Sequence, residues 1–325
     1  MLISVIMPAY NAEQWIEDAV RHVINQTYRD WELIIINDGS TDSTPEICMR
    51  LQNEDSRIKV LAQENKGLCM TRNIGMSCIK GEYFIIIDSD DRLKKNALFT
   101  MAQTADRTGA DIIISGYVVY KQIKPGIRNE EVRRIKKDYV FSPNGNLNSN
   151  EISSLIEAVL ISPTWNKLFH KKFTEYLFDI DLSLHEDTLF SLNAIANAKK
   201  AAVISNVLYE YIIRNNSLSQ KFHPEAMVSL ERMSDIFQAH CEGKLKKEIA
   251  AWIIDFWFMQ TKKIANNKSL NNDQKKRYLN EAVHSDVFQK YGKIRYANTI
   301  KRKISIIMFR FGMQKEYLRI IERKN

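Results

Sequence analysis

The sequence predicts an α/β fold, in which a mostly parallel sheet is flanked by helices and followed by a C-terminal helical extension. Over the first 115 residues, short apolar runs alternate with helical patterns, the order expected of a parallel sheet with right-handed crossovers. The apolar runs contain little polar alternation, as expected for strands that are buried on both faces. From about residue 220 the helical patterns continue without strands. We therefore expect one region at 1–220 and a helical, basic region at 221–325.

Five apolar runs in the first region are predicted to form strands: Leu2–Met7, Leu33–Ile36, Ile58–Leu61, Tyr83–Ile87 and Ile112–Ile114. Four segments with helical spacing alternate with them: Ala12–Gln26, Pro45–Gln52, Leu68–Ile79 and Asn96–Thr108. In the first of these segments, Trp15, Ala19 and Val23 recur at the spacing of one helix face.

Shorter patterns complete the first region. They predict a helix at Glu151–Ile161, a segment at Trp165–Phe169, a helix after His185, and strands at Ala202–Ser205 and Leu208–Arg214. Residues 117–150 are polar and basic and match no element, apart from a loop at Ser142–Asn146.

The composition excludes several classes of protein. An apolar fraction of 45% and a charged fraction of 26% are ordinary for a soluble globular protein. The four cysteines form no C-x-x-C pair, which argues against a disulfide framework or a zinc site. The N-terminus lacks the features of a signal peptide, and no apolar stretch approaches the ~20 residues that span a bilayer. These observations predict a cytoplasmic protein.

The first candidate site lies at Asn37–Asp42, after the second predicted strand. In an open α/β sheet, ligands bind at the carboxyl ends of the strands, and a carboxylate such as Asp38 can accept a hydrogen bond from a base or a ribose there. Gly39 lets the chain turn closely around it. The alternative is an ordinary turn that caps the next helix, since Asp, Gly and Ser are common in turns.

The second candidate site is Asp88-Ser89-Asp90-Asp91, directly after the apolar run that ends at Ile87. Three carboxylates within four residues repel one another unless a positive charge lies among them. Mg²⁺ and Mn²⁺ are hard cations of the kind that one or two carboxylates hold together with substrate phosphates. A helix cap could explain one of the three aspartates but not all of them. This run therefore predicts a site for Mg²⁺ or Mn²⁺.

The third candidate site is Glu186-Asp187, where two acids open a predicted helix. Acidic residues in a first helical turn are stabilised by the helix dipole, which offers a purely structural explanation. The functional interpretation is a general base that removes a proton from an acceptor hydroxyl.

Two arginines are candidates for binding a diphosphate. Arg72 lies on the predicted helix before the acidic strand end, and Arg214 follows the last predicted strand, ahead of the polar run Asn215–Ser219. Guanidinium groups suit phosphate oxygens because they donate two parallel hydrogen bonds. For Arg214, a surface salt bridge is an equally good explanation.

Together these segments resemble one family, the family 2 glycosyltransferases of the GT-A fold, and in particular bacterial members that build surface polysaccharides. Five segments carry the resemblance in order: Val5–Asn11, Asn37–Asp42, Arg72–Gly75, Asp88–Asp91 and Glu186-Asp187. The segment Trp165–Phe169 also resembles one that is common in the bacterial surface-polysaccharide members. The resemblance covers about residues 1–220, which it implies to be the catalytic domain.

The resemblance implies a UDP-sugar donor and an inverting mechanism. With the two arginines, the residues predicted to contact the nucleotide-sugar are Pro8, Ala9, Tyr10, Asn11, Asp38, Arg72, Asp88, Ser89 and Arg214. Pro8–Asn11 would line the uracil and ribose, and Asp38 would accept a hydrogen bond from the uracil ring, with Arg72 nearby.

The resemblance also implies the metal ligands and the catalytic residues. Asp90 would bind Mn²⁺ or Mg²⁺ directly, with Asp88 nearer the ribose, and Asp91 is a further candidate for the metal. Asp187 would be the catalytic base, and Glu186 would contact the acceptor or a metal-bound water. The acceptor would be a hydroxyl of a glycan or of a lipid-linked oligosaccharide, as in capsule, O-antigen or exopolysaccharide synthesis.

Rival functions lack their signatures. A nicotinamide-dependent dehydrogenase would carry G-x-G-x-x-G where this sequence has Pro8–Asn11, and no P-loop motif is present. A processive synthase would need a Q-x-x-R-W motif and membrane spans, and neither is present. The remaining alternative is a sugar-nucleotide or glycan-binding module that has lost catalysis, against which the retention of Asp88, Asp90 and Asp187 argues.

The basic charge is concentrated at the C-terminus. Residues 293–325 contain ten Lys or Arg and two Glu, and this surplus of eight accounts for the net charge of +8. Lys301-Arg302-Lys303 lies beside an apolar run that ends at Phe311. Such a pattern fits a helix on an anionic membrane surface at the inner face of the cell membrane, or a helix that packs against the rest of the chain or a second subunit of a homo-oligomer. Without a nucleic-acid-binding motif, one basic strip does not predict a nucleic-acid partner.

Overall fold

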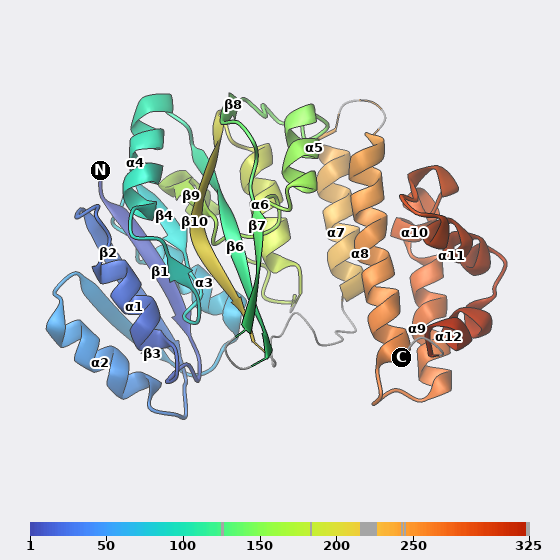
Figure 1. Cartoon of the computed structure of the whole chain (residues 1–325), viewed down its shortest axis with the longest axis horizontal. Helices are drawn as coiled ribbons and strands as arrows, with labels where there is room; N and C mark the ends of the chain where they lie inside the picture. The colour runs from blue at the N-terminus through green and yellow to red at the C-terminus, as the bar shows by residue number, and fades with distance from the viewer. Residues whose placement is uncertain (125–126, 183, 215–225, 242, 244, 323–325) are drawn as a thin grey trace. The chain divides into compact units, whose positions relative to one another are not determined.

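The computed structural model describes residues 1–322 except 125–126, 183, 215–225, 242 and 244. The chain forms two compact units (Figure 1). The first unit comprises Met1–Gly145, Glu157–Asp181 and Glu186–Asn215. The second comprises Asn146–Ile156, Leu182–His185 and Asn216–Asn325. The boundary predicted near residue 220 lies outside the described residues, as does the run Asn215–Ser219.

In its described residues, the first unit is built on one sheet of ten strands. The strands are β1 (Ile3–Ala9), β2 (Trp31–Asp38), β3 (Ile58–Gln63), β4 (Tyr83–Ile86), β5 (Arg92–Leu93), β6 (Ile112–Lys124), β7 (Ile127–Arg133), β8 (Tyr139–Phe141), β9 (Lys167–His170) and β10 (Ala201–Ile213). Their order is β3-β2-β1-β4-β9-β6-β10-β5, while β7 pairs with β6 and β8 with β10. The strands β3, β2, β1 and β4 are mutually parallel, as predicted. The strand β9 is antiparallel to both of its neighbours, so the whole sheet is mixed.

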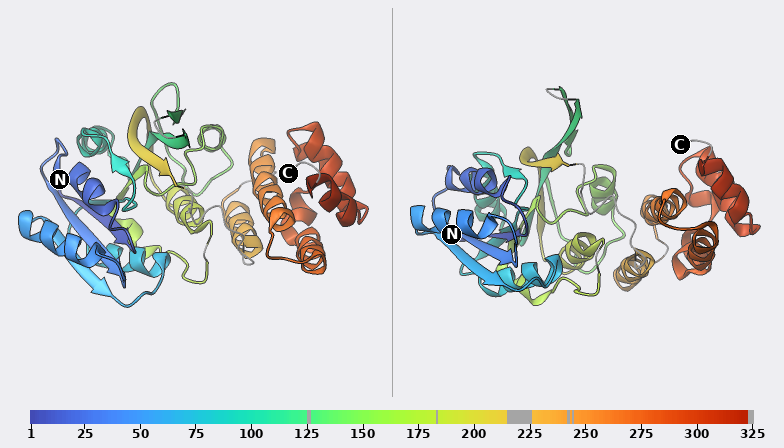
Figure 2. Two further views of the ribbon diagram at one scale, coloured as in Figure 1. Left: turned by 60° about the horizontal axis from the view of Figure 1, so that its bottom comes forward. Right: turned by 90° about the horizontal axis from the view of Figure 1, so that it is seen from below.

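Helices cover both faces of this sheet (Figure 2). They are α1 (Ile16–Ile24), α2 (Thr44–Glu54), α3 (Leu68–Ser77), α4 (Ala97–Thr108) and α6 (Glu186–Ala196), with a short 3₁₀ helix η1 (Lys171–Glu175). The helices α1 and α2 lie side by side on one face, and α3 packs against β1 and β2 from the other. Gly75 permits that close packing, because a Cβ atom there would lie 2.4 Å from Cγ2 of Ile6.

The predicted strands are present. Apart from the short strand β5, for which no element was predicted, the differences lie after residue 114. Residues 117–150, for which no element was predicted, extend β6 and form β7 and β8. The strands predicted at Ala202–Ser205 and Leu208–Arg214 are one strand, β10, whose pairing with β6 shifts register between Val203 and Val207. An irregularity of this kind interrupts the period-2 pattern, so the sequence presents one strand as two.

The second unit is helical in its described residues. Its elements are α5 (Asn150–Glu157), α7 (Ala226–Ala239), α8 (Lys247–Asn266), α9 (Asn272–His284), α10 (Asp286–Tyr291), η3 (Ile294–Tyr296), α11 (Ile300–Arg310) and α12 (Gln314–Glu322). The fully buried Trp257 of α8 organises its core, stacking on Phe288 at 4.5 Å and meeting Phe309 edge-on at 5.0 Å. Within the described ranges, no helix has the length and apolar character needed to cross a membrane.

Candidate active site

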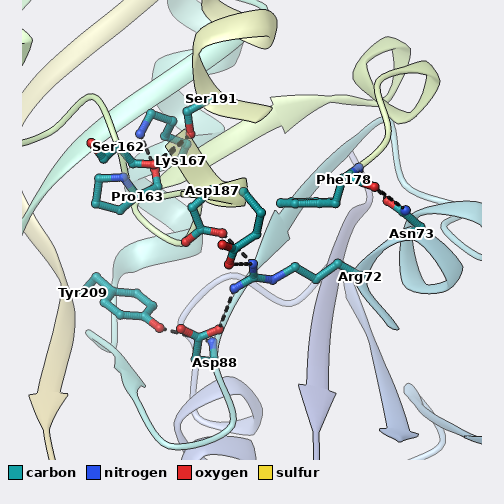
Figure 3. A network of polar contacts seen from close by, with 11 residues as sticks. Arg72, Asn73, Asp88, Ser162, Pro163, Lys167, Phe178, Asp187, Ser191 and Tyr209 are labelled. Carbon is teal, nitrogen blue, oxygen red and sulfur yellow. Dashed lines mark hydrogen bonds and ion pairs between the residues drawn. The ribbon is translucent and has the colours of Figure 1, made fainter. Parts of the chain in front are cut away.

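A buried arginine gathers three carboxylates at the carboxyl end of the parallel strands (Figure 3). Nη1 of Arg72 donates to Oδ1 of Asp187 at 2.5 Å and to Oε1 of Glu186 at 3.0 Å. Nη2 donates to Oδ1 of Asp88 at 3.3 Å. These residues come from α3, from the start of α6 and from the segment after β4. The fold therefore joins three of the motifs that the sequence singled out.

The local packing fixes the position of Arg72. Its side chain is 2% exposed, and its guanidinium lies 5.2 Å from the ring centre of Phe178. The next residue, Asn73, exchanges two hydrogen bonds with the backbone of Phe178, at 2.9 and 2.8 Å. The Arg72 head group is therefore held by packing as well as by ion pairs.

One guanidinium is set against three carboxyl groups in this cluster. Burial opposes the charge on Arg72, but Asp187, Asp88 and Glu186 together raise its pKa above the ordinary value. Burial, together with the neighbouring Asp187 and Asp90, raises the pKa of Asp88 to about 7, although Arg72 acts to lower it. Burial and Asp187 also raise the pKa of Glu186. The cluster holds more negative charge than its own arginine balances.

Asp91 anchors the acidic segment after β4. Its Oδ2 accepts a hydrogen bond from the hydroxyl of Tyr209 at 2.9 Å, and its Oδ1 accepts one from the backbone N–H of Ile212 at 2.8 Å. The same Tyr209 hydroxyl accepts from the backbone N–H of Asp88 at 3.2 Å. Burial raises the pKa of Asp91 well above its ordinary value. Asp91 therefore connects this segment to β10.

Sequence reasoning did not identify Tyr209. Its ring is fully buried and stacks on Trp165 at 4.4 Å between centroids. In the sequence, Tyr209 is a tyrosine inside a predicted strand, and such a tyrosine is usually a core residue. Only the pairing of distant segments reveals that its hydroxyl holds two members of the acidic run.

Asp90 pairs with Arg214, which the sequence analysis named as a candidate for binding a diphosphate. Nη1 of Arg214 donates to Oδ2 of Asp90 at 2.8 Å, and Nη2 donates to the backbone carbonyl of Asp90. The guanidinium carbon lies 4.8 Å from the ring centre of Trp15. Burial raises the pKa of Asp90, and Arg214 lowers it.

The residues present can hold a hard divalent cation only if a substrate supplies further ligands. Among the described residues, no group of three or more His, Cys, Asp or Glu side chains is placed to hold a metal ion. Asp91 has both oxygens engaged within the protein, whereas Arg72 and Arg214 occupy one oxygen each of Asp88 and Asp90. With respect to the described residues, Asp88 and Asp90 each keep one oxygen without a hydrogen bond. Two such carboxylates match the way Mg²⁺ is bound together with substrate phosphates.

The end of β1 meets the segment after β2. Pro8 and Ala9 are buried, while Tyr10 is 51% exposed. Asn11 has a positive φ of 47°. Its side-chain oxygen accepts a hydrogen bond from the backbone N–H of Thr41 at 2.8 Å, so it holds the two segments together.

Asp38 bonds to the segment after β3. Its Oδ1 accepts from the side-chain amide of Gln63 at 2.7 Å and from the backbone N–H of Lys66 at 2.8 Å. Its Oδ2 accepts from the backbone N–H of Gly67 at 2.9 Å. The side chain is buried, and its bonds run to this segment rather than to Arg72.

A second missed residue, Lys167, supports the helix that carries Glu186 and Asp187. Its fully buried ammonium donates to the carbonyl of Leu160 at 2.8 Å, to the side-chain oxygen of Asn166 at 2.9 Å and to the carbonyl of Pro163. Ser191 of α6 donates to the same Pro163 carbonyl at 3.3 Å (Figure 3). Burial lowers the pKa of Lys167 well below its ordinary value, while the three acceptors match the three N–H bonds of its charged form.

A comparison with known protein families identifies the family of the chain. The family model described as glycosyl transferase family 2 matches residues 4–170, about half of the chain. The chain therefore belongs to glycosyl transferase family 2.

The curated relatives are bacterial glycosyltransferases. Glycosyltransferase GlyA of Streptococcus pneumoniae is 31% identical over 77% of this chain and 36% of its own length. Glycosyltransferase GlyG of the same species is 43% identical over 37% of this chain and 40% of its own. EpsJ of Bacillus subtilis, described as an uncharacterized glycosyltransferase, is 30% identical over 70% of this chain and 65% of its own. The chain thus spans from about a third to two thirds of the length of these relatives.

Solved structures share the fold. The crystal structure of S. aureus TarS in complex with UDP-GlcNAc is 21% identical, covers 99% of this chain and 91% of its own, and has a TM-score of 0.73. The mannosyltransferase PcManGT from Pyrobaculum calidifontis, in complex with GDP-Man and Mn²⁺, is 13% identical, covers 96% of this chain and 84% of its own, and has a TM-score of 0.55. These likenesses show a GT-A-like fold with a helical C-terminal region.

Proposed function

We propose that the chain is an inverting, metal-dependent glycosyltransferase. It transfers a hexose or N-acetylhexosamine from a UDP-sugar to a hydroxyl of a glycan or lipid-linked saccharide, in the synthesis of a bacterial surface polysaccharide. The observation that carries the proposal is the convergence of Asp88, Glu186 and Asp187 on the buried Arg72, with bonds of 2.5 to 3.3 Å. This unbalanced cluster lies at the strand ends where α/β sheets bind ligands.

The donor is proposed to bind between the end of β1 and the acidic segment after β4. The UDP-GlcNAc bound by TarS supports a UDP-sugar as donor. The exposed ring of Tyr10 offers an aromatic face to a base, and Arg214 offers a guanidinium to a diphosphate. Pro8–Asn11, Asp38 and Ser89 complete the proposed nucleotide-sugar site.

Asp88 and Asp90 are the proposed ligands for Mn²⁺ or Mg²⁺, and the Mn²⁺ in the PcManGT structure supports a divalent cation in this fold. Bound there, the cation would neutralise negative charge that develops on the leaving diphosphate. Asp91, with both oxygens bonded to Tyr209 and Ile212, would position the two ligands instead of binding the cation.

Asp187 is the proposed base. Arg72 donates to its Oδ1, while Oδ2 accepts no hydrogen bond from any residue that the structure describes. Because Arg72 orients the carboxylate through Oδ1, Oδ2 would be able to accept the proton of the acceptor hydroxyl. That hydroxyl attacks the anomeric carbon as its proton passes to Asp187 and the bond to the diphosphate oxygen breaks, which inverts the anomeric centre. Glu186 would contact the acceptor.

A panel of UDP-sugars tests this function. The purified chain is incubated with each sugar in Mn²⁺, in Mg²⁺ and in excess chelator, and release of UDP and protection from thermal unfolding are measured. We expect one or a few UDP-sugars to be hydrolysed slowly and to raise Tm, in metal only. Protection without hydrolysis or transfer for every sugar would identify a binding module that has lost catalysis.

A further inference from the structure

Helix α11 has apolar residues on two opposite faces. On one face, Ile306 and Phe309 are buried, and the ring of Phe309 lies 4.5 Å from that of Tyr317 in α12. Arg302 shares this face and pairs with Asp255 of α8 at 2.7 Å. This face attaches α11 to the core of the helical unit.

The opposite face forms an exposed apolar stripe. Its members, which we call the α11 stripe, are Ile300, Ile304, Ile307 and Phe311, and they are 77%, 53%, 40% and 78% exposed. Their spacing places them within one narrow sector of a helix. Isolated exposed apolar residues are ordinary, but a continuous row of them marks an interaction surface.

Basic side chains flank the α11 stripe on both sides. At 3.6 residues per turn, Lys301 projects from one side of the row, and Lys303 and Arg310 project from the other. The segment 293–313 contains six Lys or Arg and no Asp or Glu. Lys301 and Lys303 are exposed, and neither pairs with a carboxylate of a described residue. The surface is therefore apolar along its centre and uniformly positive along its edges.

We propose that the α11 stripe is a docking surface for an anionic lipid bilayer. The apolar row would enter the boundary between head groups and acyl chains, while Lys301 and Lys303 meet lipid phosphates. The helix has 11 residues, or about 16 Å of length, which is too short to cross the hydrocarbon core and suits a helix lying in its surface.

Charge complementarity favours a bilayer over a second copy of the chain. In a symmetric contact the same surface meets itself, so each row of lysines would approach another row of lysines. No carboxylate in 293–313 would offset that repulsion. An anionic lipid surface supplies the missing negative charge. Each basic residue near that surface contributes about 1 kcal/mol to the free energy of binding.

Flotation of the full-length chain with vesicles tests this surface. One vesicle preparation contains phosphatidylcholine with phosphatidylglycerol, and the other contains phosphatidylcholine alone. We expect flotation with the anionic vesicles at about 0.1 M salt and its loss at about 1 M salt, where the Debye length falls from about 10 Å to about 3 Å. The triple variant Ile304→Ser, Ile307→Ser and Phe311→Ser should lose binding, and Lys301→Gln with Lys303→Gln should weaken it roughly 30-fold.

Matched variants in the same unit control for a general loss of apolar or positive surface. Val228→Ser with Met259→Ser removes two comparably exposed apolar side chains, and Lys262→Gln with Lys268→Gln removes two exposed charges. Both should float like the wild type.

The proposal is overturned if the wild-type chain ignores anionic vesicles or if the triple variant binds them equally well. It is also overturned if ultracentrifugation finds a wild-type dimer that the triple variant abolishes. Because the variants leave the proposed catalytic residues unchanged, hydrolysis of UDP-sugars in solution reports separately on the proposed function.

Discussion

Two strand ends of the same sheet carry aspartates with opposite surroundings. At the end of β2, Asp38 is buried and accepts three hydrogen bonds, from Gln63, Lys66 and Gly67. After β4, Asp88 accepts one bond from a guanidinium that also serves Glu186 and Asp187. The first carboxylate is satisfied by its own fold, and the second belongs to a cluster with excess negative charge.

The difference separates an aspartate whose hydrogen bonds hold a loop from aspartates that we propose to bind a metal ion and the substrates. A buried carboxylate with enough hydrogen-bond donors contributes to the stability of the fold. Clustered carboxylates with too few positive charges near them lower that stability. Folded proteins keep such an arrangement mainly at functional sites. The contrast therefore points to the segment after β4, rather than the one after β2, as the centre of the chemistry.

The largest effect is expected from Asp187→Asn, which should reduce turnover by about 10²- to 10⁴-fold, because an amide cannot accept the proton of the acceptor. The affinity for the UDP-sugar should stay within about twofold of the wild type, since the base acts on the acceptor in the transition state. Steady-state kinetics and calorimetry with the donor identified in the panel measure the two quantities. Lost donor affinity with normal turnover would make Asp187 a donor ligand.

The next largest effect is expected from Arg72→Met. The substitution removes the one cation among three carboxylates, and breaking a buried ion pair in this way typically costs about 3–5 kcal/mol. Urea denaturation of the chain without ligand measures the change. Phe178→Leu provides a matched control, because it disturbs the packing beside the guanidinium and leaves the ion pairs in place. A loss below about 1 kcal/mol for Arg72→Met would mean that the cluster is not held together by this arginine.

A pair of equivalent substitutions sharpens the comparison between the two strand ends. Asp38→Asn should lower the free energy of unfolding by about 1–3 kcal/mol, because an amide nitrogen would face backbone N–H groups that need an acceptor. Asp90→Asn removes a half-exposed ion pair and should change the free energy of unfolding by less than about 1 kcal/mol. Equal losses in urea denaturation of the two variants would remove the distinction between loop anchor and ligand site.

The smallest effect on stability is expected from Arg214→Gln, again below about 1 kcal/mol, since its side chain is partly exposed and its ion pair lies near solvent. The affinity for UDP should nevertheless fall several-fold, because a guanidinium proposed to contact the diphosphate is lost. Calorimetry with UDP in Mn²⁺ measures this change. Unchanged affinity would make Arg214 a structural partner of Asp90 only.

Much of the sheet could be predicted because its parallel strands are buried on both faces. Runs such as Leu33–Ile36 and Tyr83–Ile87 leave little choice other than a buried strand. The antiparallel insertion of β9 between β4 and β6 could not be predicted, since Lys167–His170 is short and its partners lie far away in the sequence. Periodicity identifies an element, but it does not choose that element's neighbour.

Some residues of the candidate site could be predicted from the local sequence, and others could not. Asp88, Glu186 and Asp187 could be nominated because acidic side chains at strand ends and helix starts stand out from their surroundings. Tyr209 could not, because it resembles an ordinary strand residue and acquires its role only through contacts with the distant Asp88 and Asp91. Lys167 could not, because its role depends on the burial of its ammonium group among oxygens of Leu160, Pro163 and Asn166. Asp38 was predicted to accept a hydrogen bond from the uracil ring, and its bonds to Gln63, Lys66 and Gly67 could not be predicted from the sequence.

The most direct test of the excess charge after β4 is the binding of UDP to the full-length chain with and without a divalent cation. Calorimetric titrations would compare the wild type and Asp90→Asn, each in Mn²⁺ and in excess chelator. The account predicts that chelation weakens binding of UDP to the wild type by about tenfold or more, and that Asp90→Asn in Mn²⁺ binds as weakly as the wild type in chelator. Equal affinity of the wild type under both conditions, or full affinity of Asp90→Asn in Mn²⁺, would contradict it.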